Sequence, residues 1–334
     1  MATLPSEFAM PASPRLGRRA GIVSIGACVP AGILTNAQLE TMVETSDTWI
    51  MERTGIRQRH RTGSGETAST IGAAAARDAL DRAGNPRVDV IIAATCSPDT
   101  LIPSVACLIQ RQLDMGGIPA FDINAACSGF VYGLSVAEGL IGTGVAETIL
   151  VVATEAMTSL VDYGDRTTCV LFGDGAGAAV VQPTDRGGIV ARRWGADGGE
   201  ADLIYFGPPP GGSAEDPDAL RMAGRGTYRL AVERLCTIAE QLCADAGWTL
   251  DEVQHFIPHQ ANLRIIEASA KRLGVPMERV VVNVDEVGNT SAASIPLALE
   301  SAVRASRLRD GDKVLAVAFG AGATWGGVAF EWDH

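Results

Sequence analysis

Apolar residues follow two different patterns along the chain. Some runs, such as residues 88–94, are apolar apart from a single residue, here Asp89, which is typical of a strand buried on both faces. In other segments apolar residues recur every three or four positions, which indicates amphipathic helices. This alternation predicts an α/β protein. We expect strands at 20–29, 88–94, 120–123, 148–154, 188–194, 253–257, 280–284 and 313–318, and helices at 35–43, 66–83, 103–113, 130–141, 228–246, 262–273 and 292–305.

The order of the predicted elements occurs twice. Two glycines that end helices, Gly84 and Gly247, lie 43 and 42 positions before Cys127 and Asn289 respectively. Each half also finishes with Phe-Gly-x-Gly and an apolar strand. We interpret the chain as a duplication of one unit, a mixed sheet with helices on its faces. The alternative is chance similarity, because unrelated α/β chains share the same alternation of strands and helices. The two halves are residues 20–185 and 186–334.

Composition narrows the possible functions. The net charge of −12 argues against nucleic acid as a partner. No apolar run is long enough to cross a bilayer, so we expect no membrane segment. Seven scattered cysteines without a C-x-x-C pair fit neither a disulfide framework nor a zinc site, and they favour a reducing cytoplasm. Residues 1–19 lack the apolar core of a secretory signal, and we expect a disordered leader there.

One cysteine lies where a reactive thiol would be useful. Cys127 comes just before the helix predicted at 130–141, and small residues flank it on both sides. The partial positive charge of a helix N-terminus favours thiolate over thiol, so we expect an activated nucleophile. The alternative is that Cys127 is a small buried hydrophobic residue.

Two polar residues in the second half are candidates to act with this cysteine. His259 follows the strand predicted at 253–257, and strand ends are where α/β proteins place reactive groups. Asn289 lies between Gly288 and Thr290, where a simple turn residue is the alternative. We expect the other histidines at 60 and 334 to be solvated.

A cysteine, a histidine and an asparagine admit two chemistries. In peptide hydrolysis, asparagine orients histidine. In acyl transfer with carbon–carbon bond formation, Cys127 holds the acyl group as a thioester while His259 and Asn289 donate N–H groups to a developing enolate. The second scheme requires the proton of His259 on Nε2. Backbone N–H groups of Cys127 and of the Gly-rich loop at 320–322, with Ala321 at its centre, form the oxyanion hole in this scheme.

Several ordered motifs resemble those of β-ketoacyl-acyl carrier protein synthase III, from about residue 20 to the end of the chain. The resemblance implies the thiolase fold, two duplicated halves packed as a five-layer αβαβα sandwich, in a homodimer. It also implies that Cys127, His259 and Asn289 are catalytic. Elongating ketosynthases have histidine in place of Asn289, and thiolases have a second reactive cysteine in the last Gly-rich loop. The motifs are TSDTWIMERTGIR at 45–57, NAACSG at 124–129, FGDGAGAAV at 172–180, PHQANLRII at 258–266, GNTSAASIP at 288–296 and FGAGATW at 319–325.

The resemblance implies a decarboxylative condensation that starts fatty-acid synthesis. Cys127 takes an acyl group from acyl-coenzyme A, and malonyl-acyl carrier protein loses carbon dioxide to form the attacking enolate. No metal or cofactor is required. The alternatives are a related enzyme of secondary metabolism that passes the acyl group to oxygen or nitrogen, a non-catalytic partner subunit, and a cysteine peptidase.

The resemblance also implies binding residues. Trp49 and Arg166 enclose the adenine of coenzyme A, and Ile102 lines the acyl pocket of the partner subunit. Members of this family often have an aromatic residue at the position of Ile102. Because isoleucine is smaller, the resemblance implies an acyl pocket that favours branched or longer primers. The other coenzyme A contacts are Arg53, Asn262 and Gly224. The carrier protein docks on Gln260, Ala261, Asn262, Leu263, Arg264, Lys271 and Arg272. The charges of Arg264, Lys271 and Arg272, taken without the resemblance, indicate only a solvated helix face.

Overall fold

Five strands form the larger of the two main sheets. The computed structural model describes residues 17–208 and 218–333, and within it the strand order is β1-β7-β6-β4-β5. Strand β4 runs parallel to β5 and β6, whereas β7 is antiparallel to β6 and β1. The strands are β1 (Arg19–Cys28), β4 (Val90–Ala94), β5 (Ala120–Ile123), β6 (Ile149–Ala156) and β7 (Asp174–Thr184).

The second main sheet has the order β11-β12-β13-β8. Strand β11 is parallel to β12, and the other neighbours are antiparallel. Its strands are β8 (Gly188–Ala196), β11 (His255–Pro258), β12 (Lys313–Gly320) and β13 (Thr324–Glu331). Two hairpins complete the strands: β2 (Gly32–Thr35) with β3 (Gln58–Arg61), and β9 (Ile204–Phe206) with β10 (Leu220–Met222).

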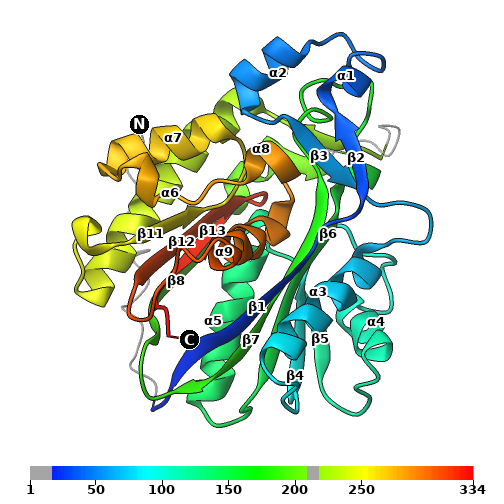
Figure 1. Ribbon diagram of the computed structural model, residues 1–334. Coiled ribbons are helices and arrows are strands. Elements are labelled where there is room, and N and C mark those ends of the chain that lie inside the picture. Colours follow the sequence, from blue (N-terminus) through cyan, green and yellow to red (C-terminus); the bar gives the residue numbers. More distant parts are fainter. Residues whose placement is uncertain (1–16, 209–217, 334) are drawn as a thin grey trace.

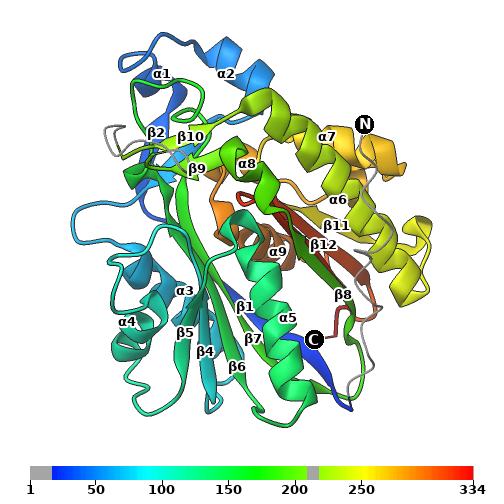
Figure 2. The same ribbon diagram turned by 180° about the vertical axis from the view of Figure 1, so that it is seen from behind.

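The helices and the two sheets form five layers, αβαβα (Figures 1 and 2). Helices α5 and α9 lie between the sheets, so both sheets are covered on two faces, as continuous apolar strands require. Helices α3 and α4 cover the outer face of the first sheet, and α6 and α7 that of the second. Their bounds are α3 (Ala68–Arg82), α4 (Val105–Gln112), α5 (Gly129–Gly142), α6 (Gly224–Ala246), α7 (Leu263–Leu273) and α9 (Ser294–Arg304).

Small residues let these layers approach closely. A Cβ atom at Gly26 in β1 would lie 2.2 Å from the backbone nitrogen of Ala79 in α3. On the other face of the same sheet, a Cβ atom at Gly177 in β7 would lie 2.6 Å from Cβ of Pro296 in α9. Neither glycine has a positive φ, so packing and not backbone conformation demands glycine at these positions.

Two predicted elements differ from the structure. The polar segment around Trp49 contains the helix α2 (Asp47–Thr54), which begins at the N-cap Ser46 and ends at Gly55 in the left-handed conformation. The strand expected at 280–284 is absent: the Gln260 side chain takes the hydrogen bonds of Val281 O and Asn283 N that a neighbouring strand would make. The short helices are α1 (Asn36–Leu39) and α8 (Val284–Val287).

The N-terminal boundary and one histidine, His60, also differ from expectation. Strand β1 already begins at Arg19, and the guanidinium of Arg18 lies 2.6 Å from the Glu147 carboxylate, so neither residue belongs to a disordered leader. His60 is half-buried and its Nδ1 lies 2.6 Å from Pro30 O, so its side chain is not fully solvated. Residues 1–16 and His334 lie outside the described residues.

Within residues 17–208 and 218–333, every helix is too short or too polar to cross a bilayer.

Candidate active site

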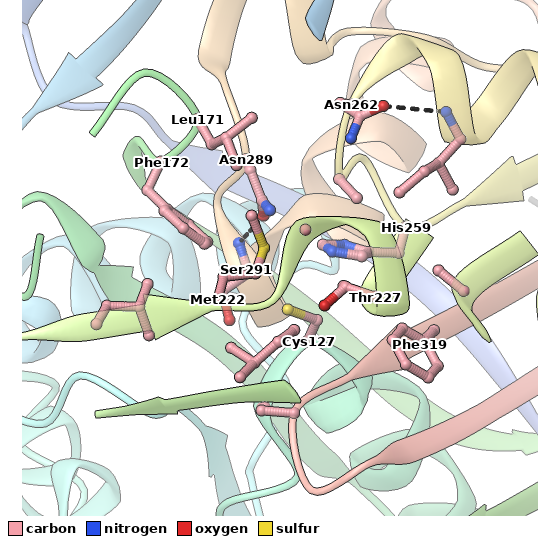
Figure 3. Close-up of a pocket in the computed structure, with 18 of the residues that line it drawn as sticks. Cys127, Leu171, Phe172, Met222, Thr227, His259, Asn262, Asn289, Ser291 and Phe319 are labelled. Carbon is pink, nitrogen blue, oxygen red and sulfur yellow. Dashed lines mark hydrogen bonds between the residues drawn. The ribbon is translucent and has the colours of Figure 1, made fainter. Parts of the chain in front are cut away.

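The three candidate residues line one deep pocket. Its volume is about 850 Å³, and Figure 3 shows the side chains of Cys127, His259 and Asn289 converging on it. They come from segments that are remote in sequence: the start of α5, the end of β11 and the loop before α9. The pocket walls are mainly apolar, and include Met157, Leu171, Phe172, Ile204, Phe206, Leu220, Met222, Leu235 and Phe319.

Cys127 is held in a tight turn that leads into α5. It lies in the 3₁₀ turn Ala126–Ser128, and Ala126 has a positive φ of 46°, which costs a non-glycine residue about 1–3 kcal/mol. The hydroxyl of Thr324 donates a 2.8 Å hydrogen bond to Ala125 O, which ties this turn to the start of β13. The surrounding packing therefore maintains a strained turn that presents the sulfur to the pocket.

The backbone of the Gly-rich loop lies directly against this turn. A Cβ atom on Gly320 would lie 2.7 Å from the backbone nitrogen of Cys127, so only glycine fits there. Ala321 and Gly322 line the pocket beside the thiol. The structure thus places the two segments proposed for the oxyanion hole next to each other.

The resting form of Cys127 differs from the expected thiolate. The thiol is accessible from the pocket but surrounded by protein, and this desolvation raises its pKa to about 12. The nearby Ser291 hydroxyl lowers the pKa, while the Glu155 carboxyl raises it further. Burial therefore favours the neutral thiol over the thiolate in the free protein.

His259 is buried and uncharged. Its side chain sits after β11, whose residue Pro258 pairs with Val317 of β12, and burial lowers its pKa to about 3. Its Nδ1 lies 2.6 Å from the hydroxyl of Ser294, which also accepts a hydrogen bond from Gln260 N. We assign the Ser294 proton to the bond with Nδ1, because this arrangement satisfies all three groups. The assignment leaves the imidazole proton on Nε2, facing the pocket.

Hydrogen bonds of the Asn289 backbone and side chain orient this residue. Its N–H donates to Leu171 O and its carbonyl accepts from Gly173 N, so the residue bridges to the Gly-rich segment of the first half. The side-chain oxygen accepts a 2.9 Å hydrogen bond from Ser291 N (Figure 3). With the oxygen occupied, the side-chain NH₂ group is left to donate into the pocket.

The predicted coenzyme A residues gather at the mouth of the pocket. Trp49, Arg53, Arg166, Gly224 and Asn262 all line it. The guanidinium of Arg166 already lies over the Trp49 ring, 5.1 Å from its centroid, so a base can enter between them only when the two side chains separate. Asn262 caps α7, with its side-chain oxygen accepting from Ile265 N (Figure 3).

The carrier-protein residues do not all lie on the surface. Arg264, Lys271 and Arg272 are exposed on α7, and Arg264 lies 5.9 Å from the centroid of the Tyr228 ring. Gln260, however, is fully buried, and its amide bonds Pro258 O and Val281 O. Gln260 is therefore a structural residue and was wrongly assigned to the docking surface; of the remaining members, Ala261, Asn262 and Arg264 line the pocket.

Three contributors to the site were not predicted from the sequence. Ser294 lies within the motif at 288–296, but its link to His259 spans 35 residues and depends on the packing of α9. Thr324 likewise reaches the cysteine turn from 199 residues away. Arg225 adds a cation to the pocket lining. Its position just before the helix predicted at 228–246 is the sequence signal that could have identified it. His255 is structural: its Nε2 lies 2.9 Å from Asp312.

The sequence is similar to one family over most of its length. Residues 121–198 match the family described as 3-oxoacyl-[acyl-carrier-protein (ACP)] synthase III, and residues 243–332 match its C-terminal part. The β-ketoacyl-[acyl-carrier-protein] synthase III of Roseiflexus sp. (strain RS-1) is 47% identical over 323 residues, which are 94% of this chain and 98% of that protein.

Two solved structures have the same fold. The 3-oxoacyl-[acyl-carrier-protein] synthase III from Aquifex aeolicus VF5 has a TM-score of 0.89 at 42% identity, over 94% of this chain and 100% of that one. The priming β-ketosynthase from the R1128 polyketide biosynthetic pathway has a TM-score of 0.90 at 36% identity, over 97% and 99%. This chain is therefore a thiolase-fold protein and belongs to the 3-oxoacyl-[acyl-carrier-protein] synthase III family.

Proposed function

We propose that the protein joins an acyl group from acyl-coenzyme A to malonyl-acyl carrier protein, with loss of carbon dioxide, and so initiates fatty-acid synthesis. The observation that carries this proposal is the convergence of Cys127, His259 and Asn289 on a single apolar pocket. A thiol nucleophile and two neutral N–H donors are the groups that this reaction needs. Membership of the family supports the same reaction.

In the first half-reaction the thiol of Cys127 takes the acyl group. Its sulfur attacks the thioester carbonyl, whose oxygen accepts hydrogen bonds from the backbone N–H groups of Cys127 and Ala321. Coenzyme A leaves as the free thiol. The acyl chain occupies the apolar wall of the pocket, where burial of each methylene group contributes about 0.8 kcal/mol.

In the second half-reaction the malonyl thioester loses carbon dioxide. Nε2–H of His259 and the NH₂ group of Asn289 donate to the thioester oxygen, on which negative charge develops as the enolate forms. The enolate carbon then attacks the acyl carbonyl, and the Cys127 thiolate is released. Decarboxylation supplies the carbanion, so the scheme needs neither a strong base nor a metal or cofactor.

The pair of neutral donors also separates this reaction from its alternative. Transfer of the acyl group to an oxygen or nitrogen nucleophile forms no enolate, so it has no use for His259 and Asn289 as they are arranged here. The buried, neutral His259 is a poor general base, since its pKa is about 3. Condensation is therefore favoured.

We assign the pocket mouth to the two thioester carriers. Trp49 and Arg166 take the adenine of coenzyme A after they separate, and Arg53, Gly224 and Asn262 line the route to the thiol. The acidic carrier protein docks on the exposed cations Arg264, Lys271 and Arg272, with Ala261 and Leu263 beside them.

We also propose a homodimer built on β5. This strand is at the edge of the first sheet, and unpaired strand edges favour pairing with another chain. Phe121 on β5 is 37% exposed, and Leu101 and Ile102, in the segment before α4, are 92% and 84% exposed, which are apolar side chains that a second copy would cover. Ile102 does not line the pocket of its own chain, which is consistent with a role in the partner's acyl pocket.

A cytoplasmic location is supported by the state of the cysteines. All seven are free thiols, as expected in a reducing compartment. Cell fractionation tests this location, and recovery of the protein outside the cytoplasm would exclude it.

Replacing the nucleophile tests the reaction itself. Cys127→Ser should abolish the acyl-enzyme adduct formed with acyl-coenzyme A, because a serine hydroxyl is a far weaker nucleophile than a thiol at neutral pH. Intact-protein mass spectrometry measures the adduct, with Cys107→Ser, an exposed cysteine, as the matched control. An acylated Cys127→Ser protein would refute the assignment.

Removing the Ser294 hydroxyl tests the histidine tautomer. Ser294→Ala should lower the decarboxylation rate of malonyl thioester about 10- to 100-fold, with KM and the acylation step unchanged, and Ser294→Thr should restore it. Nitrogen NMR of the imidazole should show loss of the single Nε2–H tautomer. Ser301→Ala, on the same helix, is the control. Unchanged decarboxylation would show that Ser294 does not position His259.

Charge reversal on α7 tests the docking surface. Arg264→Glu should raise KM for malonyl-acyl carrier protein roughly tenfold at low salt and much less at high salt, with little change for a small malonyl thioester. Arg87→Glu, an exposed arginine before β4, makes the same change in net charge elsewhere. Equal losses on both substrates would argue against docking at Arg264.

An added charge on β5 tests the dimer. Phe121→Glu should convert the protein to monomers in sedimentation equilibrium, because a buried unpaired carboxylate at the interface costs several kcal/mol. Turnover should fall with dissociation, since each pocket loses the partner's Ile102. A wild-type protein that sediments as a monomer would contradict the dimer directly.

A further inference from the structure

Pro258, the last residue of β11, interrupts the hydrogen bonding of this strand with the segment that follows residue 279. Phe256 forms a parallel bridge with Val280, and Val281 N donates a 2.9 Å hydrogen bond to Phe256 O. The next bond of a parallel pair would run from the N–H of residue 258 to Val281 O. Proline has no N–H, so the pairing cannot continue and Val281 O needs another donor.

The side chain of Gln260 supplies that donor as an inserted amide group. Its Nε2 donates to Pro258 O at 2.7 Å and to Val281 O at 3.1 Å, and its Oε1 accepts from Asn283 N at 3.1 Å. Gln260 has no exposed surface, so water cannot take over these bonds. The amide therefore sets the separation between the end of β11 and segment 281–283.

The first of these two segments carries the proposed donor His259. The Ser294 hydroxyl lies 2.6 Å from His259 Nδ1 and accepts a 3.3 Å hydrogen bond from Gln260 N. One hydroxyl is thus shared by the imidazole and by the backbone of the next residue. A shift of the Gln260 backbone would therefore move the imidazole relative to the hydroxyl that orients it.

The second segment leads to the proposed donor Asn289. Segment 281–283 continues directly into the short helix α8, in which Val287 N donates to Asn283 O. Only Gly288 separates the end of α8 from Asn289. The hydrogen bond between Gln260 and Asn283 N therefore acts at the start of a short, helical connection to the Asn289 amide.

We propose that Gln260 is a positioning residue that fixes the spacing of His259 and Asn289 for the decarboxylation step. This inference rests on the proposed function, in which those two residues donate N–H groups to the enolate. Such donors act only at hydrogen-bond distance, and a displacement of about 1 Å can cost about 100-fold in rate. Gln260 is absent from the pocket lining, so it acts through its neighbours.

The first half-reaction has a different support. Cys127 lies in the turn before α5, and Thr324 joins this turn to the start of β13, beside the loop that contains Ala321. The side-chain bonds of Gln260 described above end instead on β11 and on segment 281–283. Loss of the Gln260 amide should therefore impair decarboxylation and spare acylation of the thiol.

The main test is Gln260→Met, which keeps the length of the side chain and removes its amide. We expect kcat for decarboxylation to fall about 10- to 100-fold with malonyl-acyl carrier protein and with malonyl-coenzyme A alike, and KM to change less than about twofold. Acylation by acyl-coenzyme A, followed by mass spectrometry, should stay near the wild-type rate. Gln182→Met makes the same change at a half-buried glutamine of β7 and is the control.

Both rates are measured on one preparation, because Gln260→Met leaves three buried backbone groups without a partner and lowers stability. An unfolded fraction lowers acylation and decarboxylation equally, so it leaves their ratio unchanged. A change in this ratio is therefore a readout that a merely structural role of Gln260 would not produce.

Gln260→Glu is a second variant that keeps the shape of the side chain. Burial opposite two carbonyl oxygens raises the pKa of the new carboxyl, so the group is neutral at low pH. The neutral acid can accept from Asn283 N and donate to one of the two carbonyls. Relative to the wild type at the same pH, decarboxylation should fall less than in Gln260→Met at about pH 6, and further as the pH rises and the acid ionises.

The outcomes separate this proposal from the one it rests on. A Gln260→Met protein with the wild-type ratio of the two rates overturns the positioning role. His259→Ala and Asn289→Ala proteins that decarboxylate normally would instead overturn the proposed function. A loss confined to malonyl-acyl carrier protein, as a higher KM, would return Gln260 to the docking surface and also overturn the positioning role. If Gln260→Met does not fold, a Gln260→Glu protein with the wild-type ratio at every pH overturns it.

Discussion

The site depends on the burial of two helices between two sheets. Helices α5 and α9 fill the middle layer, and their N-terminal ends meet: a Cβ atom on Gly129 would lie 3.3 Å from Cβ of Ala292. The residues just before these helices therefore share one location. Cys127 precedes α5, and Asn289 and Ser291 precede α9. Strand β11 ends beside them and contributes His259, so apolar packing brings together polar groups that are remote in sequence.

Desolvation then determines the charge state of this location. Burial drives the Cys127 pKa up and the His259 pKa down, and both groups are neutral at physiological pH. A thiolate–imidazolium pair, familiar in cysteine peptidases, is thereby disfavoured. What remains is a set of hydrogen-bond donors whose direction is controlled by neighbours, Ser294 for the imidazole and Ser291 N for the Asn289 amide. Electrostatic preorganisation in a dry pocket gives such donors their strength.

Local patterns were sufficient for much of the fold and for the identity of the reactive residues. The strand at Ala120–Ile123 was predicted to the residue, since Pro119 and Asn124 bound this short segment. Long-range contacts explain the predictions that were wrong. The sequence does not show that the folded chain buries Gln260. Nor does it show that the Gln260 amide takes the hydrogen bonds that a strand at 280–284 would otherwise make. The thiolate prediction failed for the same reason, because burial cannot be computed from helix position alone. The duplication into halves remains a prediction.

The contact between Arg166 and Trp49 has a consequence for turnover. In the free enzyme the Arg166 guanidinium already covers a face of the Trp49 indole. The protein itself therefore makes much of the contact that a bound base would make with this ring. If this pair takes the adenine of coenzyme A, as proposed above, the nucleotide gains only the difference between its own stacking and the contact that it displaces. In that case the arginine competes with the bound nucleotide for the ring, which weakens its retention and speeds the exchange of one thioester for the next.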